Sequence, residues 1–389
     1  IQLKSGMPTI AVRDLVIQRR ENDLVAASFG RSFFVLDDYT PLRTLSEDLL
    51  QQRAHMFPIK DALWYVQARP LGGGEKASRG ASYYTAPNPE YGATFTYFLR
   101  ESLRTRRAER QDRERRAARA GEDTPYPSWE ELKAEDREES PAVILTIRDE
   151  DGNVVRRING STSSGIHRTT WDFRYPSYTA SSVQNPGRGP LAAPGSYTVS
   201  IEQRVDGVTT QLVAPTPFEV APLLEPTLSP ANRAEVLAFQ RRAGELQRAV
   251  MTASRVAGAA AEQIGDIKSV IEVWPGADPS LREEARALEL RLMDLREVLN
   301  GDPTKPRRNE SAMPGLTSRV STAMRGSYAT TYGPTGTHRR NYEIAASQFA
   351  ELLPALRQLI EVDLVALEDK LEAAGAPYTG DRLPNWQPD

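Results

Sequence analysis

Residues 239–274 read FQRRAGELQRAVMTASRVAGAAAEQIGDIKSVIEVW, and this stretch decides the fold of the second half of the chain. Its apolar residues recur in alternating steps of four and three, the spacing of one face of a long helix. The positions are Phe239, Ala243, Leu246, Val250, Ala253, Ala257, Ala260, Ile264, Ile267, Ile271 and Trp274. A long helix with one apolar face needs partners, so we expect further helices to pack against it.

Similar leucine-rich seams follow at residues 281–299, 316–323 and 349–371. Proline and glycine mark the connections between them, which favours an antiparallel helical bundle over residues 223–389. An intermolecular coiled coil is the alternative. The step of five from Leu359 to Leu364 interrupts the last seam and indicates a stutter.

Upstream of this region the apolar period changes to two. Residues 91–222 carry short strand patterns separated by turn signals, which predicts an immunoglobulin-like β-sandwich. The expected strands are 94–100, 142–148, 153–158, 166–174, 196–204, 208–214 and 216–220. Asp149-Glu150-Asp151-Gly152, between two of them, is typical of a hairpin turn.

Strand patterns also begin the chain, at 9–12, 15–18, 24–28 and 32–36. So few strands cannot bury a core of their own. We therefore expect residues 1–50 to be the end of a larger β-structure, with a connecting segment at residues 51–90. Gly72-Gly73-Gly74-Glu75-Lys76 in that segment lacks the spacing of a P-loop and is interpreted as a flexible linker.

Two runs of residues resemble a known family. Residues 14–38, DLVIQRRENDLVAASFGRSFFVLDD, resemble the closing blade of large exported bacterial proteins with BNR/Asp-box, sortilin-like β-propellers, often labelled "glycosyl hydrolase". Residues 88–99, NPEYGATFTYFL, are similar to the run that opens a β-sandwich in that family. The chain departs from the family in one respect, because it has no Asp box of the S-x-D-x-G-x-x-W type.

The resemblance implies a multidomain β plus α protein: a propeller-blade remnant, an immunoglobulin-like β-sandwich and an antiparallel helical bundle, in that order. It also implies export to the periplasm, the cell surface or the extracellular space. The function it implies is a non-catalytic scaffold or interaction module that binds a protein, a glycan or its own propeller. The alternative is part of a glycoside hydrolase, or another hydrolase, whose catalytic residues lie in blades absent from this chain.

Residues 101–140 form a charged insertion between the first two strands of the sandwich. Its first half is rich in arginine and its second half is acidic, with few apolar residues between them. We interpret it as a solvated helix followed by a mobile acidic loop. A nucleic-acid patch is disfavoured because the neighbouring carboxylates oppose phosphate, and a partner-binding arm is the third reading.

Composition narrows the chemistry. The 389 residues carry a net charge of -3, which argues against a generally basic nucleic-acid binder. The chain has no cysteine and three histidines, so disulfides and thiolate chemistry are excluded. No apolar run in the sequence approaches the length of a transmembrane helix. We expect a protein partner or the missing propeller portion, possible glycan binding, no nucleic acid and no transmembrane segment.

Each residue group that suggests chemistry also has a structural explanation. Asp149, Asp151 and Asn153 lack the glycine and glutamate positions of a calcium loop and suit a turn. His167 has no nucleophile motif nearby, and Asp37-Asp38 suits the end of a blade strand. Tyr83-Tyr84, Tyr91 and Trp64 suit packing at a domain junction better than a ligand platform. We therefore assign no catalytic residue, no cofactor and no metal ligand, and expect no enzyme activity from this chain by itself.

Overall fold

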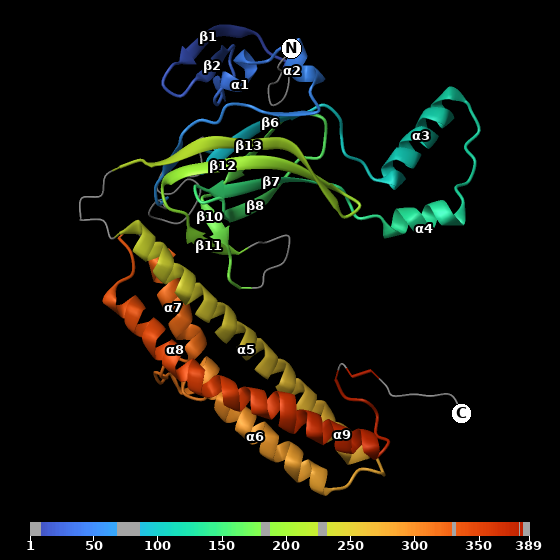
Figure 1. Ribbon diagram of the computed structural model, residues 1–389, viewed down its shortest axis with the longest axis vertical. Helices are drawn as coiled ribbons and strands as arrows, with labels where there is room; N and C mark the ends of the chain where they lie inside the picture. The colour runs from blue at the N-terminus through green and yellow to red at the C-terminus, as the bar shows by residue number, and fades with distance from the viewer. Residues whose placement is uncertain are drawn as a thin grey trace. The chain divides into compact units, whose positions relative to one another are not determined.

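A computed structural model describes residues 9–67, 86–179, 187–224, 232–328, 332–380 and 382–383 (Figure 1). The chain is of mixed α and β structure, and about 44% of the described residues are helical and 25% lie in strands. It divides into two compact units. The first comprises residues 1–175 and 192–225, and the second comprises residues 176–191 and 226–389.

The first unit contains three sheets. A three-stranded sheet begins it, in the order β1 (Val12–Gln18), β2 (Asp23–Ser28) and β3 (Phe33–Leu36). The second sheet has the order β4 (Ala54–Met56), β6 (Ala93–Leu99) and β9 (Gly165–Trp171). The third has the order β5 (Ala62–Trp64), β13 (Val208–Pro222), β12 (Gly195–Val205), β7 (Ala142–Asp149) and β8 (Val154–Gly160). Two short helices, α1 (Thr40–Arg43) and α2 (Glu47–Gln51), follow β3.

The second and third sheets share an aromatic core. Phe95 of β6 and Trp171 of β9 are buried, as are Tyr197 of β12 and Phe218 of β13. The ring of Phe218 lies 5.2 Å from that of Phe95 and 6.3 Å from that of Trp171, centroid to centroid. Edge-to-face contacts of this kind add to the stabilisation from burial. Alternation along the strands therefore places one face of each sheet in a common core.

Three features of the first unit differ from the sequence-based expectation. The segment expected to connect the first strands to the sandwich, with one strand at residues 62–68, contributes both β4 and β5, which pair with β6 and β13. The last two expected strands are a single long strand, β13, whose extra residues opposite Val199–Glu202 of β12 form bulges where the sequence pattern predicts a break. The acidic half of the charged insertion is not a loop throughout, because α4 (Trp129–Arg137) follows α3 (Arg106–Ala120).

The second unit is helical. Its elements are α5 (Arg233–Val273), α6 (Ser280–Asn300), the short 3-10 turn η2 (Pro306–Arg308), α7 (Leu316–Tyr328), α8 (Gly336–Arg357), the π-helix η3 (Gln358–Leu364) and α9 (Val365–Ala373). Two short strands, β10 (Arg174–Pro176) and β11 (Arg188–Leu191), lie at the points in the sequence where the chain passes from one unit to the other. Helix α5 begins at Arg233, where the side chain of Asn232 accepts a hydrogen bond from the backbone N–H of Ala234 at 3.0 Å.

The seam of α5 lies in the core as its spacing predicts. Nine of its eleven positions are buried, and Leu246 and Trp274 pack against the same core while partly exposed. The core of this unit also takes in side chains from α6, α7, α8 and α9. Leu359 and Leu364 both lie within η3, and both are buried. A π-helix inserts one residue into a helical turn, so it keeps both leucines in the core across the step of five.

Among the described residues, no helix is both long enough and apolar enough to cross a membrane.

Candidate interaction surface

The three-stranded sheet β1–β2–β3 is the part of the protein whose apolar side chains are least covered. Its tight turns are encoded locally, since Asn22 and Gly30 adopt positive φ angles of 59° and 73° in the two connections. Asparagine and glycine are the residues that tolerate this conformation best. The pairing is antiparallel throughout, with Val16 opposite Val25 and Val25 opposite Val35.

One face of this sheet, which we call the valine face, carries Val16, Val25, Phe33 and Val35. Directly paired residues project to the same side, and the register places Asp14, Gln18, Asp23 and Ala27 on this face as well. Phe33 is 70% exposed, Val16 56% and Val35 55%. Three large apolar side chains are therefore exposed on a face that also carries polar residues.

The opposite face, which we call the leucine face, is more uniformly apolar. It carries Leu15, Ile17, Leu24, Ala26, Phe34 and Leu36, paired across the strands in the same way. Ala26 is buried and Leu24, Phe34 and Leu36 are half-buried, whereas Leu15 and Ile17 on β1 are exposed. A sheet with large apolar residues on both faces is typical of a layer that has neighbours on both sides.

The edges of the sheet are open as well. Strand β2 is central, and within the described part of the chain neither β1 nor β3 pairs with any further strand. Open edges present unpaired backbone N–H and C=O groups, which natural proteins usually protect. Together, the faces and edges offer surface that another β-structure would cover.

Polar contacts hold one end of this sheet to the rest of the first unit. The backbone N–H of Asp38 donates to the Asp23 carboxylate at 2.9 Å, and an Arg168 guanidinium nitrogen donates to the carbonyl oxygen of Asp38 at 2.6 Å. Lys60 forms an ion pair with Glu21, which lowers the pKa of that carboxyl. These contacts position one end of the sheet, while Val16, Phe33 and Val35 on the valine face and Leu15 and Ile17 on the leucine face remain exposed.

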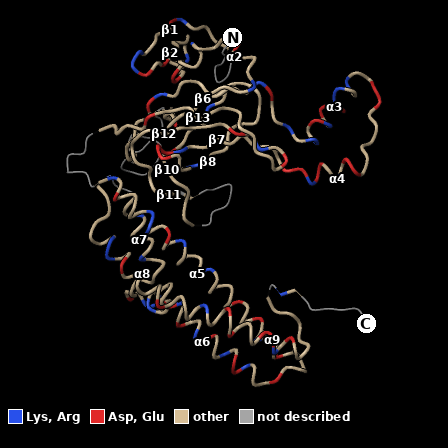
Figure 2. Tube along the Cα trace, viewed as in Figure 1, with Lys and Arg blue, Asp and Glu red and all other residues tan. Residues whose placement is uncertain are grey.

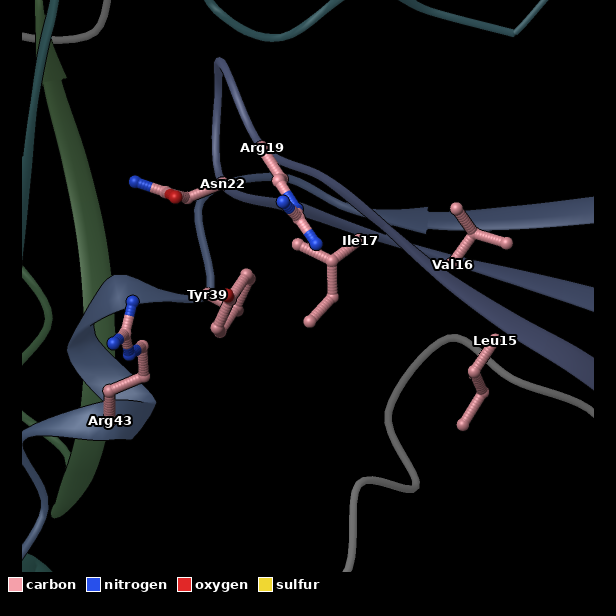
Figure 3. Close-up of a pocket in the computed structure, with 7 residues that line it drawn as sticks. All are labelled: Leu15, Val16, Ile17, Arg19, Asn22, Tyr39 and Arg43. Atoms are coloured by element: carbon pink, nitrogen blue, oxygen red, sulfur yellow. The ribbon is translucent and has the colours of Figure 1, made fainter.

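A shallow hollow of about 640 Å³ lies beside β1 (Figure 3). It is lined by Leu15, Val16, Ile17, Arg19, Asn22, Tyr39 and Arg43. Leu15 and Ile17 point to the same side of β1, and Tyr39 lies between Arg19 and Arg43. The Arg43 guanidinium carbon is 6.0 Å from the centre of the Tyr39 ring. Apolar side chains next to the guanidinium groups of Arg19 and Arg43 suit a partner surface that combines apolar groups with a carboxylate.

The candidate acid/base residues occupy structural positions. Asp38 has a φ of 41°, and its carboxylate accepts from the Thr40 backbone N–H at 3.2 Å, so Asp37-Asp38 forms the turn after β3. His167 lies on β9, where its Nε2 is 2.7 Å from the Ser163 carbonyl oxygen and its ring packs beside Tyr97. Neither of these contacts joins His167 to Asp37 or Asp38, so the structure does not pair the histidine with either carboxylate.

The residues considered for a calcium loop, and Trp64 and Tyr91 of the possible aromatic platform, have local structural contacts. The Asn153 backbone N–H donates to the Asp149 carboxylate at 2.8 Å, which makes this stretch a hairpin turn. Trp64 donates its indole N–H to the Ala192 carbonyl oxygen at 2.9 Å, and the Tyr91 ring packs edge-on against Phe173. Tyr83-Tyr84 and the glycine-rich stretch 72–76 lie outside the described residues. Within the described ranges, no group of three or more acidic or histidine side chains is placed to hold a metal ion.

The hollow beside β1 was not anticipated from the sequence, because Arg19, Tyr39 and Arg43 belong to three separate local patterns. The apolar faces did leave a signal. Phe33-Phe34-Val35-Leu36 is a continuous apolar run, which is the pattern of a strand buried on both sides.

Comparison with known proteins adds no family assignment. No protein-family model matches the chain, and a search of curated proteins finds no significant match.

Proposed function

We propose that this chain is a non-catalytic scaffold and interaction module from the C-terminal part of an exported β-propeller protein. In this proposal, β1–β2–β3 belongs to the closing blade and docks on the rest of the propeller. The two sheets that share the aromatic core form an immunoglobulin-like sandwich, and the helices of the second unit form an antiparallel bundle. The sequence resemblance at residues 14–38 supports the propeller assignment.

The observation that carries the proposal is the exposure of apolar residues on both faces of β1–β2–β3. A propeller blade is covered on both faces by neighbouring blades, so its strands need apolar residues on both sides. Burying a valine, leucine or phenylalanine side chain contributes about 1.5–3 kcal/mol. Docking of both faces would therefore contribute several such increments, which explains why this sheet is built from apolar residues.

Hydrogen exchange tests the proposal. The gene's full reading frame and the 389-residue chain would be expressed in parallel, and amide exchange of residues 12–36 would be compared. We expect the full product to contain propeller blades and to protect these amides strongly, because its blades would cover the sheet. Equal exchange in the two proteins, or a full product without blades, would show that the sheet is not part of a propeller.

The strands β7 and β12 serve as an internal control in this experiment. They are paired on both sides within the first unit and contribute the buried residues Leu145, Ile147 and Ile201. Their protection should be the same in both proteins. A general change in stability would instead shift these amides together with those of the sheet.

A further inference from the structure

The charged insertion folds into a helical hairpin, formed by α3 and α4, that we call the arm (Figure 1). It leaves the first unit after β6 and returns before β7. Positions occupied by basic and acidic residues are distributed along both helices (Figure 2). No residue of α3 is buried, and Glu135 is the buried residue of α4. The arm therefore contributes nothing to an apolar core.

Ion pairs hold the two helices together. The Arg110 guanidinium contacts both oxygens of the Glu135 carboxylate, at 2.6 and 2.9 Å. This fork lowers the pKa of Glu135, with Arg107 adding a weaker effect. At the base of the arm, Arg204 of β12 pairs with Glu139 at 3.0 Å. A bidentate arginine–carboxylate contact fixes direction as well as distance, so the arm has a defined shape despite its lack of a core.

The tip of the arm is also ordered by its own residues. Gly121 ends α3 with a φ of 73°, the left-handed conformation typical of a helix C-terminus. Ser128 and Glu131 form a reciprocal capping box that begins α4 and places Trp129 at its first position. Trp129 is 76% exposed and Tyr126 is 99% exposed. Two large aromatic side chains are thus presented to water, Trp129 on the capped first turn of α4 and Tyr126 in the segment that joins the two helices.

The sequence around these aromatics is predominantly acidic. Residues 121–132 contain four acidic residues and no lysine or arginine. Glu131 is engaged in the capping box. Within the part of the chain that the structure describes, no ion pair engages Glu122, Asp123 or Glu130. The tip is therefore an acidic surface with two aromatic anchors at its centre.

We propose that the tip of the arm, with Tyr126 and Trp129 as anchors, is a docking site for a cationic, apolar segment of another protein. Tryptophan and tyrosine are the side chains that most often dominate binding at protein interfaces. Complementarity to the three uncompensated carboxylates selects a basic partner. The same carboxylates oppose an anionic membrane or a nucleic acid. This inference is independent of the proposed propeller docking, because it concerns a different surface.

Selection from a random peptide library displayed on phage tests the proposal. The 389-residue chain would be the bait, with counter-selection against its Y126A/W129A variant. We expect enrichment of peptides that combine lysine or arginine with apolar residues. Enrichment of acidic or purely polar peptides, or no enrichment over the counter-selected variant, would overturn the proposal.

Synthetic versions of the enriched peptides then give affinities by fluorescence anisotropy. We expect W129A to weaken binding roughly tenfold or more, because the loss of a hot-spot aromatic has this scale of effect. The E122Q/D123N/E130Q variant should bind more weakly and lose most of its salt dependence. Neither change removes an ion pair that holds the arm, so circular dichroism should show unchanged helix content.

The matched control is F33A, which removes an exposed aromatic side chain from the valine face. It should leave the affinity for the peptides unchanged. Weaker binding by F33A together with unchanged binding by W129A would place the peptide on the sheet and refute the docking site at the tip. Anionic and zwitterionic lipid vesicles provide the remaining comparison, and tip-dependent binding to vesicles without peptide binding would contradict the proposal.

Discussion

Replacing two residues of the valine face distinguishes how much this face stabilises the sheet within the 389-residue chain from how much it stabilises docking to neighbouring blades. In the F33S/V35S variant, the buried parts of the two side chains are about 30% and 45%, the complements of their exposures of 70% and 55%. Scaled by about 1.5–3 kcal/mol for a fully buried side chain, the loss within the 389-residue chain is about 1–2 kcal/mol. If blades cover the exposed parts, the same variant loses about 2–4 kcal/mol more in the full product.

Native-state hydrogen exchange measures these local opening free energies directly. The readout is the change at amides of β2, whose strand is central in the sheet and whose hydrogen bonds persist longest. V143A in β7, at a fully buried position of the neighbouring sheet, is the control and should cost the same in both proteins. Equal losses for F33S/V35S in the short chain and the full product would refute docking of the valine face.

Three further results are expected. Gly244→Ala should destabilise the helical unit by about 1–3 kcal/mol in urea unfolding, because the new methyl group would lie 2.2 Å from the Tyr178 ring. Gly258→Ala, on the same helix, places its methyl group in open space and should stabilise the unit by about 0.5–1 kcal/mol. Effects of the same sign from the two substitutions would contradict the packing of Gly244 against Tyr178. Acid should open the arm, because Arg110 and Arg107 of α3 lower the pKa of Glu135 on α4, so the stabilisation from this bridge is present above the ordinary pKa of the carboxyl and is lost as pH falls through the lowered value. Asp112, with a pKa of about 2, pairs only with arginines of α3 and of the residues before it, so its protonation should loosen α3 without separating the helices. Helical circular dichroism and proteolysis between pH 5 and pH 2 would report the opening, and an arm as resistant at pH 2 as at pH 5 would argue against ionic closure. A panel of glycosides and peptides should give no turnover with the purified chain, and turnover abolished by H167A would reverse that expectation.

The helical unit could be predicted from the sequence to a greater depth than the rest. Steps of four and three along α5 specify which side chains are buried, and the step of five at Leu359–Leu364 coincides with the π-helix. The reason is physical, since a helix seam depends on local spacing and each partner helix carries its own. A strand is expected from the sequence at residues 62–68, where β5 lies, but β4 leaves too short a pattern to recognise. The pairing of β4 and β5 with strands of the sandwich could not be predicted, because strand pairing is non-local.

The arm shows a different limit of the sequence. Its composition correctly predicts a solvated helix, α3, but the scarcity of apolar residues in its acidic half favours a mobile loop where the structure has α4. The ion pair between Arg110 and Glu135 joins residues 25 positions apart, so local sequence patterns do not reveal it. The capping box of Ser128 and Glu131, in contrast, is a local signal at the start of α4. That box, a serine followed three residues later by glutamate, was the signal that could have revealed the helix.

The sheet β1–β2–β3 is where the sequence pattern and the observed burial disagree. Phe33-Phe34-Val35-Leu36 has the pattern of a strand buried on both sides, and the structure leaves Phe33 and Val35 exposed while Phe34 and Leu36 are half-buried. Phe95 and Tyr97 of β6 show the other outcome, since both are fully buried within the first unit. Single exposed apolar residues also occur on other strands, such as Val208 of β13 at 67%, but the first sheet exposes Val16, Phe33 and Val35 on one face. Under the proposed function, this face is where apolar β-structure of a neighbouring blade would dock.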